Sequence, residues 1–116
     1  MSIVTMDNGI KYEDLNVGTG QKIEPNHTFL VTVHYTMWLK NGVKIESTHD
    51  RDKPFQFKLG VNQVIKGWDE GMVGMEVGGV RQLDVPSKLA YGRRGWGGVI
   101  PPNSDLLFKI EYLGSE

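Results

Sequence analysis

The sequence predicts an α+β fold, in which about five antiparallel strands form a sheet and one short helix covers one of its faces. Three observations support this class. Most apolar residues alternate with polar ones at period 2, which is typical of half-buried strands. One stretch, from Asn62 to Met72, has helical spacing instead. Glycine is over-used, at 15 of 116 residues, and in a β-rich chain this indicates many tight turns.

The length and composition describe one ordinary domain that spans residues 1–116. With 39% hydrophobic and 23% charged residues, the chain can bury a single core. A formal net charge of -1 gives no reason to expect a nucleic acid or a membrane as a partner. The absence of cysteine excludes disulfides and thiolate chemistry. The opening segment MSIVTMDNGI lacks the features of a signal peptide, so we expect a cytoplasmic protein.

Two strands are predicted in the N-terminal part of the chain. Ile10 and Tyr12 alternate with charged neighbours and indicate a short strand. A polar segment, residues 19–28, follows as a loop. The clearest pattern runs from Thr28 to Leu39, where apolar residues occupy every second position and β-branched residues are common. Both features favour a strand over a helix.

A hairpin is expected next. The dipeptide Asn41-Gly42 is typical of a type I′ turn, because both central residues of that turn need positive φ. Val43 to Ser47 is then the returning strand. After a polar connection, residues 55–59 alternate again and predict a further strand that ends at a glycine.

The C-terminal half contains the helix and two more strands. Val64, Ile65, Trp68 and Met72 have helical spacing, although two glycines within the segment weaken that helix. The helix must therefore be short and held by packing. The remaining predicted strands are Val80 to Val85 and Leu106 to Leu113.

Several polar motifs have ordinary explanations. The glycine-rich segment Gly92 to Val99 superficially resembles a phosphate-binding loop but lacks the Lys-Ser/Thr ending and precedes two prolines, so we interpret it as a surface loop. The histidines, at positions 27, 34 and 49, have no partners at metal-ligand spacing, and we expect no metal site. A charged cluster could be an acid/base group, but the pattern alone favours a solvated loop; its members are Glu46, Asp50, Arg51 and Asp52.

The aromatic residues leave one question open. They lie on inward faces of the predicted elements or on glycine-rich loops: Tyr35, Phe55, Phe57, Trp68, Tyr91, Trp96 and Phe108. Such a set either fills a core or lines a hollow apolar pocket. Patterning favours the core, and spacing alone does not decide between the two.

A resemblance to a known family bears on this question. The segments VTVHYTMWLKNG, RDKPFQFKLG, QVIKGWDEGMVGM, VGG, LAYG and GVIPPNSDLLFKIEYL closely resemble FKBP-type peptidyl-prolyl cis–trans isomerases, in that family's order and spacing. The match runs from about Val4 to Leu113. It implies a strongly bent antiparallel sheet wrapped around the short helix.

The resemblance also implies a pocket that binds proline-containing polypeptides and rapamycin-type macrolides, and a reaction without a cofactor. Trp68 would form its floor. The expected walls are Tyr35, Phe55, Val64, Ile65 and Phe108. Tyr91 and the Ile65 N–H would anchor the substrate, and Trp96, Val99 and Ile100 would lie on an overhanging loop. A minimal monomer is expected, because the inserted domain and the dimerisation arm of some relatives are missing.

Two departures from the family pattern bear on activity. Ile45-Glu46 stands where most members carry Phe-Asp, and Trp96 stands where many carry a histidine. Glu46 is the expected electrostatic group at the substrate carbonyl, held by Tyr35 and Arg51, and its longer side chain predicts reduced activity. Ile45 and Arg51 are also expected to contact a bound substrate or inhibitor. The alternative is that the backbone adjusts and Glu46 does the same work. A binding module with little turnover is the alternative to an isomerase.

Overall fold

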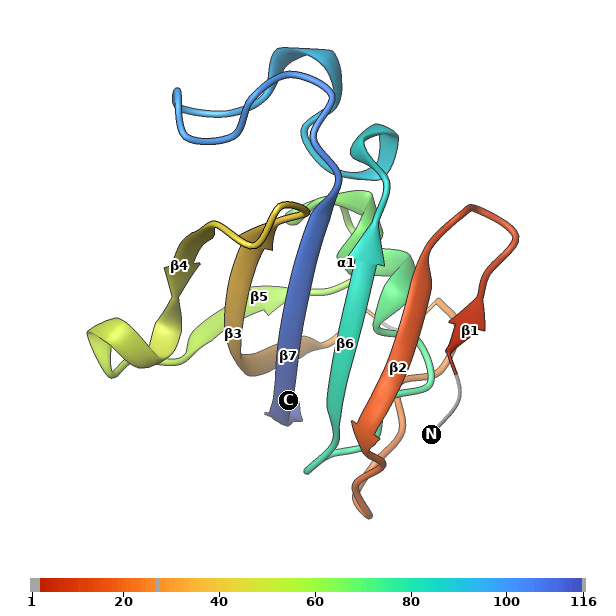
Figure 1. Cartoon of the computed structure of the whole chain (residues 1–116). Coiled ribbons are helices and arrows are strands. Elements are labelled where there is room, and N and C mark those ends of the chain that lie inside the picture. The colour runs from red at the N-terminus through yellow and green to blue at the C-terminus, as the bar shows by residue number, and fades with distance from the viewer. Residues whose placement is uncertain (1–2, 27, 116) are drawn as a thin grey trace.

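The computed structural model describes residues 3–26 and 28–115, and within them a seven-stranded antiparallel sheet packs against one α-helix (Figure 1). The strands are β1 (Val4–Thr5), β2 (Lys11–Asn16), β3 (Leu30–Leu39), β4 (Lys44–Ser47), β5 (Phe55–Lys58), β6 (Val80–Val85) and β7 (Leu106–Ser115). The helix is α1 (Lys66–Gly71), and the 3-10 turns are η1 (Thr48–Arg51), η2 (Ser87–Leu89) and η3 (Gly92–Arg94). The strand order is β1-β2-β6-β7-β3-β4, with β5 paired to β3. The predicted α+β class is confirmed.

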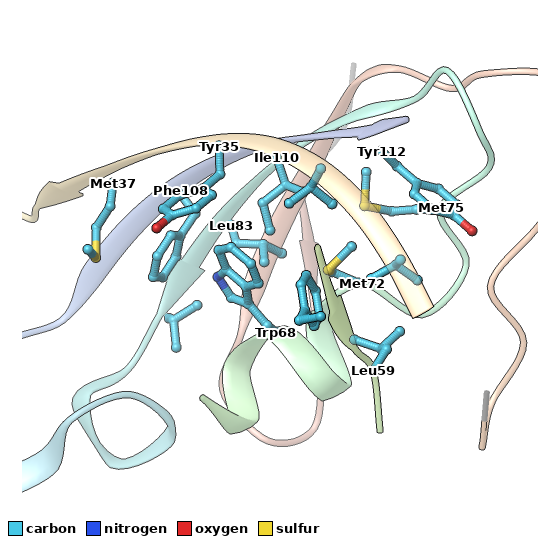
Figure 2. Close-up of a cluster of buried hydrophobic side chains, with 14 of the residues drawn as sticks. Tyr35, Met37, Leu59, Trp68, Met72, Met75, Leu83, Phe108, Ile110 and Tyr112 are labelled. Carbon is cyan, nitrogen blue, oxygen red and sulfur yellow. The ribbon is translucent and has the colours of Figure 1, made fainter. Parts of the chain in front are cut away.

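Strand β3 organises the sheet. It pairs with β7 on one edge, and on the other edge with both β4 and β5. Strand β4 pairs with residues 36–38 of β3 and β5 with residues 30–33. The register between β3 and β7 shifts at Thr32/Val33, and such a bulge bends a strand and increases its twist. In Figure 2, β3 arches over the helix and the side chains beneath it, so the expected bent sheet is observed.

The sheet has more strands than the sequence pattern predicted. Strand β1 has two residues, Val4 and Thr5, which pair with Tyr12 and Lys11. Two residues are too few to show a period. Strand β2 continues to Asn16 through a register shift that interrupts its alternation, which is why only its first half was predicted.

The helix begins later than predicted. Asn62 has a φ of 62° and Ile65 has a ψ of 151°, so the segment before Lys66 is not helical. Val64 and Ile65 therefore do not belong to the helical face with Trp68. They belong to the extended approach to the helix, which places them at the pocket described below.

Two glycines allow the helix to lie directly on the sheet. A Cβ atom at Gly67 would lie 2.4 Å from Cγ1 of Val85, and one at Gly71 would lie 3.1 Å from the Leu83 side chain. Both partners belong to β6. The glycines that weaken the helix as an isolated element are therefore what its packing requires.

The type I′ turn predicted at Asn41-Gly42 is wrong. Gly42 has a φ of 96°, but Asn41 does not have a positive φ. The Leu39 N–H donates to the Val43 carbonyl at 2.8 Å, and the Gly42 N–H donates to the Leu39 carbonyl at 2.9 Å. Lys40 therefore joins the loop, which makes it a three-residue connection with its glycine in the left-handed region. The dipeptide alone does not determine the loop length.

The core lies between the concave face of the sheet and α1 (Figure 2). Strands β3 and β7 contribute their alternate residues, which are Val31, Val33, Tyr35 and Met37 from β3 and Leu106, Phe108, Ile110 and Tyr112 from β7. The helix side contributes Trp68 and Met72. No helix in residues 3–26 and 28–115 is long and apolar enough to cross a membrane.

Candidate active site

A pocket of about 160 Å³ opens where the bent sheet leaves the start of the helix uncovered. It is lined by Tyr35, Met37, Glu46, Phe55, Gln63, Val64, Ile65, Trp68, Tyr91 and Phe108. Strands β3, β4, β5 and β7 and helix α1 each contribute to it, together with the approach to the helix and the chain after η2. Segments far apart in the sequence therefore meet at one site.

The interior of the pocket is aromatic. The Trp68 ring lies edge-to-face with Tyr35, with centroids 4.9 Å apart, and with Phe108, at 5.4 Å. Phe55 stands 6.2 Å from Trp68 and 5.9 Å from Tyr35. Such contacts each contribute about 0.5–1.5 kcal/mol beyond burial, and they hold the rings in fixed orientations. The pocket is therefore a rigid apolar cage.

Trp68 forms the floor of this cage. Its side chain rises from α1 toward the sheet, and the residue is only 4% exposed. Its Nε1–H is buried and has no hydrogen-bond partner within residues 3–26 and 28–115. The position of the indole ring is therefore set by the helix and by ring packing, and not by a hydrogen bond of its own.

A carboxylate is held at the edge of the cage. The Tyr35 hydroxyl donates to Oε1 of Glu46 at 2.5 Å, and Nη1 of Arg51 lies 3.8 Å from Oε2 of the same carboxylate. Burial and the bond to Glu46 raise the pKa of Tyr35 to about 12, so this phenol remains a donor at neutral pH. The Arg51–Glu46 pair is half exposed, and such pairs contribute about 0–1 kcal/mol. Tyr35 is therefore the main anchor of Glu46.

The backbone of β4 places Glu46 in the pocket. Glu46 pairs with Met37, whereas Lys44 pairs with Trp38, so the intervening Ile45 is an extra residue in a β-bulge. Bulges re-aim the side chains around them. Ile45 packs against the core and does not line the cavity.

Two further donors are available at the pocket. Burial, followed by the nearby negative charge of Glu46, raises the pKa of Tyr91 above its ordinary value, which keeps its hydroxyl protonated. The Ile65 carbonyl accepts bonds from the helix, but no hydrogen bond of the Ile65 N–H occurs within residues 3–26 and 28–115. Both groups line the pocket and can donate to carbonyls of a bound chain.

Tyr35 is supported by a residue that the sequence did not indicate, Thr48. Thr48 is fully buried, and its Oγ1 accepts from the Tyr35 N–H at 2.8 Å. The same oxygen lies 3.3 Å from the Tyr35 carbonyl and 2.8 Å from Nδ1 of His34. The sequence showed only a threonine directly after a predicted strand, and its burial is visible only in the structure. Thr48 ties η1 to β3 beside the carboxylate.

Eight of the residues expected at the site line the pocket: Tyr35, Glu46, Phe55, Val64, Ile65, Trp68, Tyr91 and Phe108. Five do not: Ile45, Arg51, Trp96, Val99 and Ile100. The sequence analysis missed Met37 and Gln63, which also line it. Met37 shares the inward face of β3 with Tyr35, so its alternation was the signal that could have found it.

In the loop expected to overhang the pocket, residues 96–100, some side chains are exposed and others are buried in the core. Trp96 is 60% exposed, and its ring lies 6.2 Å from that of Tyr91, whereas Ile100 is buried in the core. Trp96 and Ile100 exchange backbone hydrogen bonds of 2.9 and 3.0 Å. Gly95 makes this closure possible, since a Cβ there would lie 2.0 Å from the Ile100 carbonyl. Trp96 thus extends the aromatic surface beyond Tyr91.

Neither the histidines nor the other cavities of the described residues form a site with a comparable aromatic lining. His34 and His49 stack with centroids 4.2 Å apart, and His27 lies outside the described residues. Within those residues, no group of three or more metal-ligating side chains could hold an ion. Larger hollows of about 190 and 480 Å³ occur elsewhere. The aromatic lining, and not the volume, therefore distinguishes the pocket.

The comparisons with known proteins agree with this geometry. The model of the family described as FKBP-type peptidyl-prolyl cis-trans isomerase matches residues 19–113, which is most of the chain. The chain belongs to this family, as its sequence resemblance predicted.

The relatives and solved structures match nearly the whole chain. An FK506-binding protein of Neisseria meningitidis serogroup A is 52% identical over 101 residues, covering 87% of this chain and 91% of that protein. FK506-binding protein 1 of Candida glabrata is 48% identical over 109 residues, covering 94% and 95%. The crystal structure of AtFKBP13 matches with a TM-score of 0.90 at 38% identity, over 100% of both chains. FkpA from Escherichia coli matches with a TM-score of 0.88 at 35% identity, over 98% of this chain and 51% of that one.

Proposed function

We propose that the protein is a peptidyl-prolyl cis–trans isomerase, which accelerates rotation about X-Pro bonds in proline-containing polypeptides. The observation that carries this proposal is the aromatic cage with Trp68 as its floor and a few hydrogen-bonding groups beside it. Membership of the family supports it independently. The reaction breaks no covalent bond, so it requires no nucleophile and no cofactor.

The physical obstacle to the reaction is amide resonance, which sets a barrier of about 18–20 kcal/mol. In the twisted transition state this resonance is lost, and the carbonyl dipole is smaller than in the planar ground state. Water therefore solvates the ground state better than the transition state. Transfer of the bond into an apolar pocket favours the transition state, and each difference of about 1.4 kcal/mol gives a tenfold higher rate.

The pocket residues divide into two roles in this proposal. The aromatic cage excludes water from the twisting bond; its members are Phe55, Trp68 and Phe108. The Tyr91 hydroxyl and the Ile65 N–H donate to the carbonyls that flank the proline, which holds the chain while one bond rotates. In this proposal the Glu46 carboxylate, anchored by Tyr35, supplies the electrostatic interaction with the substrate carbonyl.

The direct test is an isomerisation assay on a Leu-Pro or Phe-Pro test peptide, with a chelator present. We expect cis-to-trans conversion well above the uncatalysed rate, which is about one event in 10–100 s. A Trp38→Leu variant is the matched control, because Trp38 projects from the opposite face of β3 to the pocket. A rate no higher than that of buffer, at micromolar folded protein, would contradict the proposal.

A second function is a binding module for peptides or macrolides with little turnover. The Ile45 bulge and the exposed Trp96 beside Tyr91 favour it, since both alter the surroundings of the pocket without removing the cage. The relatives named FK506-binding proteins extend the proposal to macrolides of the FK506 and rapamycin type. Calorimetric binding without isomerisation would select this function, whereas inhibition of turnover by the same macrolide would select the enzyme.

A further inference from the structure

A buried arginine, Arg81, lies on the inward face of β6. Arg81 is only 3% exposed, although its neighbours on that face are Leu83 and Val85. A buried cation is unfavourable unless it is paired and hydrogen-bonded. The contacts of this side chain therefore indicate which elements it connects.

The guanidinium joins three parts of the fold. Its Nε and Nη2 donate to the two carboxylate oxygens of Asp14 in β2, at 2.7 and 3.2 Å. Its Nη1 donates to the Gly71 carbonyl at 2.9 Å and to the Val73 carbonyl at 2.8 Å. The guanidinium carbon also lies 4.0 Å from the centroid of the Tyr12 ring. Arg81 thus fixes the end of the helix to two neighbouring strands.

The carbonyls that Arg81 binds lie at a helix end that needs such a partner. The last carbonyls of a helix have no partners within it and carry partial negative charge, which a cation stabilises. Gly71 is the last residue of α1, and Val73 follows the C-cap Met72. Helix α1 has six residues, so its own hydrogen bonds resist displacement only weakly.

This helix end is one turn from the pocket floor. The Met72 N–H donates to the Trp68 carbonyl at 3.1 Å, so the residue that forms the floor belongs to the turn that Arg81 closes. The Trp68 Nε1–H has no hydrogen-bond partner in the part of the chain that the structure describes. The position of the Trp68 ring in the pocket therefore depends on the position of the helix.

We propose that Arg81 is a positioning residue for the reaction: it holds the C-terminal end of α1 against β2 and β6 and so sets the position of Trp68 in the pocket. This inference rests on the proposed isomerase function. A displacement of about 1 Å in a catalytic constellation can cost on the order of 100-fold in rate. Arg81 acts on the reaction only through the helix and touches no substrate.

The test compares Arg81→Met and Arg81→Lys with a destabilised control, Ile10→Ala. Ile10 is fully buried but does not line the pocket or contact the helix end by a hydrogen bond. Two readouts are measured at a temperature where all variants are folded by circular dichroism. One is kcat and KM for a Leu-Pro peptide. The other is the Trp68 indole N–H resonance in a 15N-labelled sample, assigned by its loss in Trp68→Phe.

We expect Arg81→Met to lower kcat about tenfold with a smaller change in KM, and to shift and broaden the Trp68 resonance. Arg81→Lys keeps the charge with fewer hydrogen-bond donors and should be intermediate in both readouts. If Arg81→Met does not fold, Arg81→Lys alone provides the test. Ile10→Ala should lose thermal stability but keep the wild-type resonance and kcat. If both arginine variants keep the wild-type resonance, or match Ile10→Ala in both readouts, the proposal is overturned. If the wild-type protein showed no turnover, the isomerase function would be contradicted. The Trp68 resonance in the arginine variants would still test whether Arg81 positions Trp68.

Discussion

At the scale of single residues, the site depends on side chains whose partners come from distant parts of the chain. Trp68 contacts three strands through its ring, and Glu46 is anchored by a tyrosine of the neighbouring strand. Each of these contacts makes a prediction that a single substitution can test.

Replacement of Trp68 by alanine should lower both stability and activity. A buried tryptophan covers about 150–250 Å², and its truncation costs about 3–5 kcal/mol in unfolding free energy. Chemical denaturation and the Leu-Pro peptide assay measure the two effects. Trp38→Ala, on the outer face of β3, should keep kcat/KM near the wild-type value. If Trp68→Ala retained wild-type stability and turnover, this residue would not be the pocket floor.

Glu46 tests whether the longer carboxylate is misplaced or accommodated. The bulge at Ile45 and the bond from Tyr35 support the second alternative. Glutamine keeps an oxygen that can accept from Tyr35 but removes the negative charge, so Glu46→Gln should lower kcat/KM by about tenfold or more if that charge acts at the substrate carbonyl. The double variant Ile45→Phe/Glu46→Asp should gain little over wild type. A large gain in the double variant, with little loss in Glu46→Gln, would show that the carboxylate is misplaced. Steady-state kinetics with a thermal melt measures both variants.

Tyr35 should make the stability sensitive to alkaline pH. Its folded-state pKa is about 12, above the ordinary value of 10.0, so the fold favours the protonated phenol. This contribution is complete below about pH 10 and is lost as the pH rises from 10 toward 12, because the unfolded state then releases the proton first. Tyr35→Phe should lose less stability than wild type over this interval. Urea unfolding at pH 9 and 11 measures the difference, and parallel losses in the two proteins would refute it.

At the scale of elements, the helix packs closely against the sheet because the helix residues at the contact are glycines, which have no side chain. Gly67 and Gly71 bring α1 onto β6, and Arg81 holds its end there. This matching explains how a helix of six residues, with two glycines, can carry the floor of a site.

Gly67→Ala should be destabilising, although alanine is the better helix former. The added Cβ would lie 2.4 Å from Val85 Cγ1, and overpacking of this kind costs about 1–3 kcal/mol. Val85→Ala should recover part of the loss in the double variant, as a double-mutant cycle by chemical denaturation would measure. The matched control is Gly114→Ala, where nothing lies within 4 Å of the new Cβ, and we expect a change within about 0.5 kcal/mol. A neutral or stabilising Gly67→Ala would show that the helix moves freely on the sheet.

At the scale of the whole molecule, the pocket and the core are one structure. Strands β3 and β7 line the cavity with some inward residues and fill the core with others. A ligand in the pocket would therefore contact the same strands that form the core.

An FK506- or rapamycin-type macrolide should accordingly raise the melting temperature of the whole protein. At a free concentration 100 times Kd, binding to the native state adds about 2.7 kcal/mol to the unfolding free energy. Calorimetry should show one transition that moves upward with ligand, and Trp68→Ala should reduce this shift. A shift of equal size in Trp68→Ala would place the ligand outside the pocket.

The sequence determined the local structure because alternation is a property of neighbouring residues. The inward faces of β3 and β7 follow from period 2 alone. The same rule would have placed Arg81 inward beside Leu83 and Val85, although its charge argues against burial until its partners in β2 and α1 are known. The pocket residues were predicted from the family motifs in the sequence, and not from this periodic pattern.

Only the tertiary structure decided which inward residues line a pocket. Phe55 and Phe57 share one face of β5, yet Phe57 is buried in the core and Phe55 lines the cavity. The division depends on where the short helix lies beneath the bent sheet. It therefore depends on the bulge between β3 and β7, in which Leu113 of β7 is the extra residue, and on the contact of Gly67 with β6. The bulge at Ile45 likewise determines the direction of the Glu46 side chain. Simple alternation along β4 does not predict this direction. These features arise from contacts between distant segments, which a periodic pattern along the chain does not encode.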